Sequence, residues 1–254
     1  MPSFFTYFND FIKSLRIGGE KIFVLKYRNA LILIFLIILA DQALKIYIKT
    51  TFINGDEVKI AGDWFKLHFI ENEGMAYGMK LGFAGAAVGK ILLTTFRLIA
   101  VVFGFYFLRK LTLQGYTRGL IICGSLILAG ALGNLLDSLF YGVIFSDSPL
   151  SCFAGYYDNF HTMLTNRNRD MVAHFTSFGH GYGSFLQGRV VDMLYFPIIE
   201  IREMPNWLPL LGGKPFVFFE PVFNIADAAI SVGVMLLLGR LYFVRETKTQ
   251  TENA

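Results

Sequence analysis

Two aspartates stand in apolar segments, where a carboxylate is costly unless it is paired or used. Asp192 lies between Val-Val and Met-Leu-Tyr-Phe, and Asp227 ends the sequence Phe-Asn-Ile-Ala-Asp, three residues after Asn224 on the same predicted helix face. Each acid by itself fits a capping or surface role equally well. As a close pair they have specific chemistry, because two neighbouring carboxylates do not both ionise easily and therefore share a proton. One can then take a proton from water while the other polarises a carbonyl.

Two further polar pairs recur at helical spacing inside apolar segments. Asp41 and Lys45 are four residues apart with the acid first, the better order for an ion pair on one helix face. Asn134 and Asp137 are three residues apart on a shared face, where polar groups must find partners within a helix bundle. For both pairs the spacing favours structural contacts that fix helix packing over a direct part in catalysis.

The remaining polar motifs carry weaker signals. Asn72 and Gly74 open the sequence Asn-Glu-Gly-Met-Ala-Tyr, and because Asn and Gly tolerate positive φ the spacing alone favours an ordinary tight turn. The run Gly-His-Gly-Tyr-Gly at 179–183 lacks a strand-to-helix context and indicates a flexible loop. All four histidines lie in predicted loops, no His-Glu-x-x-His motif occurs, and Cys123 and Cys152 suggest no disulfide. A metal centre is therefore not expected.

Composition places these motifs in a membrane protein. The 254 residues are 54% hydrophobic and 17% charged, whereas soluble domains carry about 25% charged residues. A spanning helix needs about 20 mostly apolar residues, and four windows meet that need, at 29–48, 86–108, 119–140 and 222–244. Two shorter apolar runs, at 190–199 and 215–219, indicate strands between the third and fourth windows.

The distribution of Lys and Arg sets the expected orientation. Basic residues cluster before the first window, between the second and third, and at the end of the fourth, so both termini are expected in the cytoplasm. The connections at about 49–85 and 141–221 then lie outside. The net charge of +4 fits cytoplasmic loops, and no nucleic-acid partner is expected. Charged residues inside the first window, with no small-residue cleavage site after it, argue against a cleaved signal peptide.

Together these features predict an all-α membrane protein, a four-transmembrane-helix bundle with a small extracytoplasmic β element and a long outer loop insert. Residues 1–28 are expected to form a basic, partly amphipathic cytoplasmic extension. Residues 29–245 form the membrane domain, and 246–254 a polar cytoplasmic tail. Nothing in the sequence demands an oligomer, so a monomer is expected.

Five motifs follow one another along the chain. They are Asp-Gln-x-x-Lys from Asp41, Asn-x-Gly-Met-Ala-Tyr from Asn72, Gly-Asn-x-x-Asp ending at Asp137, Val-Val-Asp ending at Asp192 and Phe-Asn-Ile-Ala-Asp ending at Asp227. In this order and at these helix ends they resemble the motifs of the lipoprotein signal peptidases, the type II signal peptidase family of bacteria. The resemblance covers roughly residues 30–245, and that family shares the four-helix topology.

The resemblance implies a membrane aspartic peptidase in which Asp192 and Asp227 form the catalytic dyad and activate water. Its substrates would be prolipoproteins whose cysteine carries a diacylglyceryl group, cut just before that cysteine, in contact with membrane lipids. Asn224 would bind substrate or tune Asp227. The scheme requires neither a metal nor an organic cofactor. The family also implies a group of residues that shape the site or contact substrate: Asp41, Lys45, Asn72, Gly74, Asn134 and Asp137.

The sequence departs from that family at two places. The family has Arg directly after the third-helix Asp, whereas this chain has Ser138, so another cation must replace the lost bidentate donor or the network differs. Arg97 is one candidate. The segment 141–189 is much longer than usual, which favours a loop that covers the outer face over a lid or a substrate-selecting element.

Two other functions fit parts of the sequence. A small ion- or proton-coupled transporter could use Asp41, Lys45, Asp137 and Asp227 as a relay. Against it, the acids gather near one membrane face, and no inverted repeat occurs. A purely structural membrane subunit would leave the motifs at Asp192 and Asp227 without a purpose.

Overall fold

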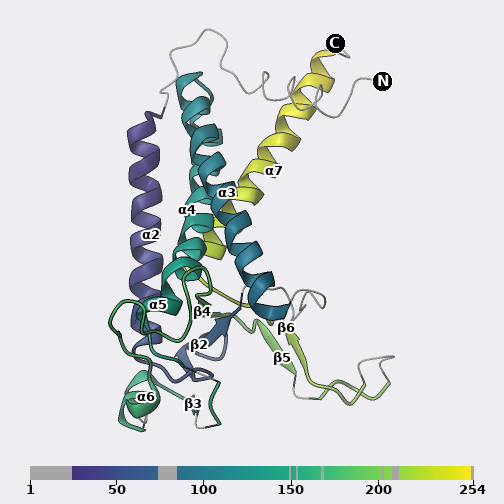
Figure 1. Ribbon diagram of the computed structural model, residues 1–254. Coiled ribbons are helices and arrows are strands. Elements are labelled where there is room, and N and C mark those ends of the chain that lie inside the picture. The colour runs from purple at the N-terminus through teal and green to yellow at the C-terminus, as the bar shows by residue number, and fades with distance from the viewer. Residues whose placement is uncertain are drawn as a thin grey trace. The chain divides into compact units, whose positions relative to one another are not determined.

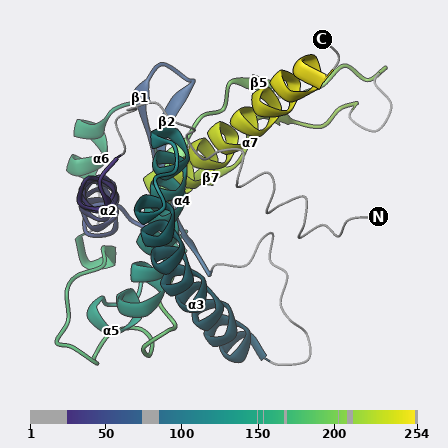
Figure 2. The same ribbon diagram turned by 90° about the horizontal axis from the view of Figure 1, so that it is seen from above.

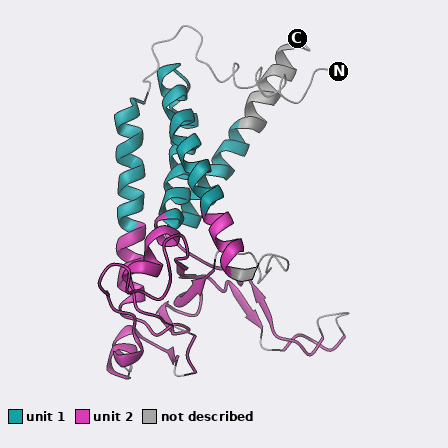
Figure 3. Ribbon diagram, viewed as in Figure 1, with its two compact units in different colours: residues 1–40, 95–135, 226–254 teal, residues 41–94, 136–225 magenta. Residues whose placement is uncertain are grey.

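The computed structural model describes residues 25–73, 85–148, 150–152, 154–166, 169–201, 203–207 and 212–252; at 85–86 and 241–252 it describes the backbone only. The chain forms two compact units, each assembled from separate stretches of sequence (Figure 3). Unit 1 comprises Met1–Ala40, Thr95–Leu135 and Ala226–Ala254. Unit 2 comprises Asp41–Thr94 and Leu136–Ile225.

Three helices in the described ranges are long and apolar enough to cross a membrane (Figure 1). They are α2 (Tyr27–Lys49), α3 (Gly85–Leu113) and α4 (Arg118–Leu136), the last continued by shorter turns to Ile144. Large apolar side chains on α2 and α3 are exposed, among them Phe35 at 62% and Phe96 at 68%, as expected of helices that face lipid. These helices coincide with the first three predicted spans.

Helix α7 (Ile225–Glu252) covers most of the fourth predicted window and continues through much of the segment predicted as a polar tail. It is not among the three helices of membrane-spanning length and apolarity found in the described residues. A fourth crossing therefore stays a prediction. Residues 1–24 of the predicted N-terminal extension lie outside the described residues.

Within unit 1, α4 and α7 approach closely at Gly130. A Cβ atom on Gly130 would lie 2.1 Å from the carbonyl oxygen of Ala226 and 2.6 Å from Cγ1 of Ile230. Small residues permit this kind of backbone contact between membrane helices. The approach lies one turn from Asn134, which itself contacts α7. Packing at Gly130 thus helps to set where the first turn of α7 lies against α4.

Gly130→Ala is expected to destabilise the protein by about 1–3 kcal/mol, because the added methyl group can be accommodated only if α4 and α7 move apart. Thermal unfolding of the purified protein in detergent would measure the change. Gly239→Ala is the matched control on α7, since nothing lies within 4 Å of its Cβ position. That variant should be neutral or slightly stabilising. Equal melting temperatures for the two variants would contradict the close helix contact.

Unit 2 contains a five-stranded sheet in the order β3-β1-β2-β4-β7. Strand β4 lies between β2 and β7 and runs antiparallel to both. The strands are β1 (Glu57–Ala61), β2 (Phe65–Asn72), β3 (Tyr156–Tyr157), β4 (Val190–Tyr195) and β7 (Val222–Phe223). A separate two-stranded sheet pairs β5 (Ile199–Ile201) with β6 (Phe216–Phe218).

The strand predictions were correct where the sequence is continuously apolar and incomplete elsewhere. Strands β4, β5 and β6 lie in or at the predicted runs 190–199 and 215–219. Strands β1 and β2 were not predicted, because the prediction relied on continuous apolar runs; their apolar residues alternate with Lys, His and Glu, which is itself a strand pattern. They make the β element larger than the sequence suggested.

The segment 141–189 supplies part of the core of unit 2. Phe145, and Met163 on α6 (Phe160–Asn166), are fully buried in one apolar cluster with Phe52, Phe69 and Met193. The Gly-His-Gly-Tyr-Gly run, predicted as a flexible loop, is held by backbone hydrogen bonds. Its members donate to the carbonyl oxygens of residues 142, 143 and 145 at 2.8–3.0 Å. The run therefore packs on the end of the third membrane helix.

That helix end changes its winding at Asp137. Helix α4 gives way to a π-helix, η2 (Asp137–Tyr141), followed by the short helix α5 (Gly142–Ile144). The backbone amide of Gly188 donates to the carbonyl oxygen of Ser138 at 2.9 Å. A Cβ atom on Gly188 would lie 1.9 Å from the carbonyl oxygen of Asp137, so only glycine fits there. This contact fixes the backbone that enters β4 against the helix end.

Candidate active site

Asp192 lies on β4 and is held by two amide side chains. It is 4% exposed. Asn224 donates from Nδ2 to its Oδ1 at 2.7 Å, and Asn72 donates from Nδ2 to its Oδ2 at 3.2 Å. Both partners come from neighbouring strands or their ends, because β2 and β7 flank β4 in the sheet. The carboxyl group therefore has a fixed orientation.

Asn224 differs from its predicted placement. Helix α7 begins at Ile225, so Asn224 precedes the helix and does not share a helix face with Asp227. Its Nδ2 donates to the carboxylate of Asp192 and, at 3.3 Å, to the carbonyl oxygen of Val191. Spacing of three residues predicts a shared face only inside a helix, and β7 ends immediately before this residue. In this structure Asn224 orients Asp192.

Asp227 lies in the first turn of α7, as predicted. Asn134 donates from Nδ2 to its Oδ1 at 2.7 Å, a contact within unit 1. This acid therefore also has an amide partner, supplied by the neighbouring helix. Asp192 belongs to unit 2 and Asp227 to unit 1, so the pairing of the two carboxyl groups stays a prediction.

A buried ion cluster surrounds Lys45. Its Nζ lies 2.9 Å from Oδ2 of Asp41, which confirms the predicted pair, and 2.7 Å from Oδ2 of Asp137. Gln42 donates to Oδ1 of Asp137 at 2.8 Å, and Tyr141 donates to Gln42 at 3.1 Å. All three charged side chains are at most 1% exposed. One cation thus serves two acids, an arrangement that tolerates burial only because every member has partners.

Asp137 also connects this cluster to the strand of Asp192. The backbone amide of Val191 donates to Oδ2 of Asp137 at 3.3 Å. Asn134 and Asp137, predicted to share a helix face, have different partners, and the π-helix begins at Asp137. Ser138, where the sequence departs from the family motif, directly follows Asp137, and the cation bound to Asp137 in this structure is Lys45. The suggested role of Arg97 stays untested.

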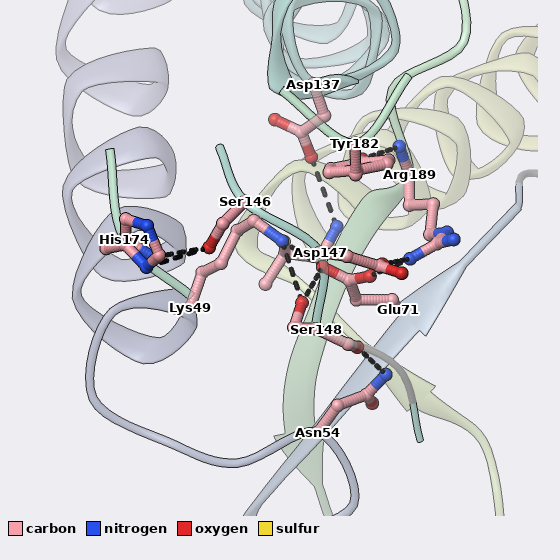
Figure 4. A network of polar contacts seen from close by, with 11 residues as sticks. Lys49, Asn54, Glu71, Asp137, Ser146, Asp147, Ser148, His174, Tyr182 and Arg189 are labelled. Carbon is pink, nitrogen blue, oxygen red and sulfur yellow. Dashed lines mark hydrogen bonds and ion pairs between the residues drawn. The ribbon is translucent and has the colours of Figure 1, made fainter. Parts of the chain in front are cut away.

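A second buried network, which the sequence analysis missed, lies next to the first (Figure 4). Lys49 forms an ion pair with Glu71, and Ser148 bonds to both, at 3.0 and 2.8 Å. Arg189, the residue before β4, joins this network at 2.9 Å from Glu71 and 2.7 Å from Asp147. Lys49 follows Lys45 by four residues, and that spacing was the signal that could have revealed it.

The Glu71 network fixes the strand that carries Asn72. Glu71 pairs with Val191 across the β2–β4 ladder, and Asn72 pairs with Val190. Two cations anchor Glu71, one from α2 and one from the residue before β4. The strand register that brings Asn72 to Asp192 is therefore stabilised by Lys49 and by Arg189. Gly74, the other predicted site residue of this motif, lies outside the described residues.

His68 lies in β2, although the sequence placed it in a loop. Burial lowers the pKa of His68 below its ordinary value of 6.5, and the Glu57 carboxylate only partly opposes this. The unfolded chain then binds more protons in the window between the two pKa values. Stability is accordingly full above about pH 6.5 and is lost as the pH falls through that window.

Wild-type protein should therefore lose melting temperature between about pH 7.5 and about pH 5.5, and His68→Gln should lose less. The amide cannot gain a proton in this range, so the variant isolates the contribution of this ring. Thermal melts of both proteins at the two pH values give the comparison, and all other titrating groups are common to both. A parallel decline in the two proteins would show that His68 is not responsible.

Among the described residues no group of three His, Cys, Asp or Glu side chains is arranged to hold a metal ion. Helices of membrane-spanning length, and two aspartates that each accept a hydrogen bond from an asparagine, define an integral membrane protein with a candidate carboxylate site. The sequence matches the family described as "Signal peptidase (SPase) II" over residues 33–243. The chain belongs to the signal peptidase II family of aspartic peptidases.

Individual relatives agree with that membership. The chain is 44% identical to a lipoprotein signal peptidase of Porphyromonas gingivalis over 207 residues, covering 81% of this chain and 79% of the relative. It is 33% identical to a lipoprotein signal peptidase of Amoebophilus asiaticus, covering 80% and 73% of the two chains. A solved bacterial membrane enzyme shares the fold at 22% identity with a TM-score of 0.50, covering 87% of this chain and 92% of that one.

Proposed function

We propose that this protein removes the signal peptide from diacylglyceryl-modified prolipoproteins, cutting just before the lipidated cysteine. Membership of the signal peptidase II family supports this substrate class. The observation that carries the site assignment is the fixed orientation of Asp192, whose two oxygens accept hydrogen bonds from Asn72 and Asn224. Asp227, oriented by Asn134, is the second catalytic acid.

The chemistry needs one water and two carboxyl groups that share one proton. The ionised acid takes a proton from water as the water oxygen attacks the scissile carbonyl carbon, while the protonated acid donates to the carbonyl oxygen. Collapse of the tetrahedral intermediate breaks the C–N bond, and the amine of the cysteine leaves with a proton. No covalent enzyme intermediate forms. The residues that shape this site or contact substrate are Asp41, Lys45, Asn72, Gly74, Asn134, Asn224 and Asp137.

Four crossings, with both termini in the cytoplasm, would place this chemistry near the outer face of the membrane. The basic segments at 1–28, between α3 and α4, and in the C-terminal part of α7 support that orientation. The substrate's acyl chains stay in the lipid, so its scissile bond lies at the same depth. An open cavity of about 170 Å³ adjoins Arg189, at the entry to β4, and offers room for part of the substrate. The protein is proposed to act as a monomer.

The substrate class can be tested with the wild-type protein in lipid vesicles. A precursor peptide that carries a diacylglyceryl cysteine should be cleaved to a product that begins with the lipidated cysteine. The same peptide without the lipid should be left intact. Mass spectrometry of both reactions identifies the cut bond. Equal cleavage of the two peptides, or cleavage elsewhere, would contradict the proposal; proton movement without cleavage would favour a transporter.

A further inference from the structure

The two-stranded sheet formed by β5 and β6 has one wholly apolar face. Ile199 pairs with Phe218, and Ile201 with Phe216, so these four side chains lie on one side of the sheet. Ile199 and Phe218 are each 51% exposed. We call these four residues the arm face. A contiguous exposed apolar surface of this kind usually marks a contact with a partner or a membrane.

The opposite face of the same sheet carries the pair Glu200 and Val217, and its acid is bound by the five-stranded sheet. Glu200, which alternates with the arm-face residues along β5, lies 3.4 Å from Nζ of Lys66 on β2. An isolated two-stranded sheet is only marginally stable in water. In Figure 1 and Figure 2 the two strands extend away from the five-stranded sheet. The arm face is therefore turned away from the protein surface to which Glu200 binds.

The connection between the strands strengthens the apolar character. Residues 204–213 read Met-Pro-Asn-Trp-Leu-Pro-Leu-Leu-Gly-Gly and contain no charged residue, whereas Glu203 and Lys214 flank them. Trp207 in this connection is 79% exposed. Exposed tryptophan beside aliphatic residues is typical of segments that lie at the lipid headgroup level. The charged residues of this segment are therefore Glu200 on the opposite face of the sheet and Arg202, Glu203 and Lys214, which separate the strands from the connection in the sequence.

We propose that the arm face and Trp207 dock on the surface of the bilayer, which is the outer surface in the orientation proposed above. The occupant is lipid because the chain has helices of membrane-spanning length, and because neither the arm face nor the connection 204–213 contains a charged residue. Burial of the arm face in the interface removes its apolar side chains from water. The arm connects β4, which carries Asp192, to β7, which precedes Asn224. Docking would hold these two strands at a defined depth relative to the lipid, independently of the cleavage reaction.

The chain contains two tryptophans, Trp64 and Trp207, which makes the contact directly measurable. In a Trp64→Phe variant all tryptophan emission comes from Trp207. The protein is reconstituted in phosphatidylcholine vesicles with or without lipids brominated near the headgroup end of the acyl chain. We expect brominated lipid to quench Trp207 emission by about half or more, and aqueous iodide to quench it weakly.

The Trp207→Phe variant is the matched control, because Trp64 is also exposed but lies beside the charged side chains of Lys59 and Asp63. Its emission should respond to iodide and little to brominated lipid.

In the Trp64→Phe background, Ile199→Ser with Phe218→Ser should reduce lipid quenching of Trp207 several-fold. Strong iodide quenching of Trp207 in vesicles, or shielding from both quenchers, would overturn the proposal. Shielding from both would place protein over the arm. Cleavage activity is not read in this experiment, so its outcome is separate from that of the proposed peptidase.

Discussion

Replacement of Asp192 by asparagine is expected to reduce cleavage of a lipid-modified precursor by at least about 100-fold and up to about 10⁴-fold, the usual contribution of an acid–base group. Asparagine keeps the size of the side chain but cannot accept a proton from water. The change is measured as initial rates of product formation in lipid vesicles. Asp227→Asn should have an effect of the same order, because each acid needs the other to divide the two proton transfers.

Two comparisons separate lost chemistry from lost folding. The carboxylate of Asp192 accepts from Asn72 and Asn224, so the asparagine variant must reorient its amide, and its melting temperature shows whether the sheet survives. Asp63→Asn provides the matched control in the same unit, as its side chain is 80% exposed and pairs only with Lys59 among the described ion pairs. That variant should cleave at the wild-type rate. Activity retained by either Asp192→Asn or Asp227→Asn would remove the proposed dyad.

Replacement of Lys45 by methionine is expected to destabilise the protein by about 3–5 kcal/mol, the cost of leaving a buried charge without its partner. Methionine fills a similar volume, so the loss is electrostatic. Lys45 lies within 3 Å of both Asp41 and Asp137, and neither acid has access to water. Thermal unfolding in detergent measures the effect. Cleavage should fall as well, because Asp137 also accepts a hydrogen bond from the backbone amide of Val191, beside Asp192.

Lys59→Met is the control for charge removal at the surface. Lys59 pairs with Asp63 and Asp158 at 3.0 and 3.1 Å, distances like those of Lys45, but the side chains of the two acids are 80% and 82% exposed. Water screens such pairs, so little change in melting temperature is expected. If Lys45→Met melted like Lys59→Met, the buried cluster would not stabilise the fold. Asp41→Asn with Lys45→Met should recover part of the loss, since one uncompensated acid is then removed.

The two ion networks explain how the sheet can orient the carboxylate of Asp192. Lys45 and Asp137 fix the amide of Val191, and Glu71 with its two cations fixes the neighbouring strand. Asp192 lies between these anchors on β4. The segment 141–189 takes part through Ser148 and Asp147, which bond to Lys49 and Arg189. In this chain the long segment therefore helps to support the strand that carries Asp192.

The sequence by itself determined the parts of this protein that depend on local pattern. Apolar runs of sufficient length predicted the first three membrane helices, because a lipid interior permits few other structures. Spacing of four residues predicted the Asp41–Lys45 pair, since one helix turn brings those side chains together. Asp192 and Asp227 were found because acids in apolar segments are rare. The order of five motifs was enough to indicate the family.

Only the tertiary structure decided which distant residues meet. Asn72 is 120 positions before Asp192 in the sequence, and the register of β2 on β4 brings the two side chains together. That register cannot be deduced from residue spacing along the chain. Asn224 binds Asp192 because α7 starts one residue later than a shared helix face would require. Glu71 and Arg189 read as ordinary surface charges until the sheet places both beside Lys49. Contacts within a helix follow from its period, whereas contacts between strands and helices depend on how the whole chain packs.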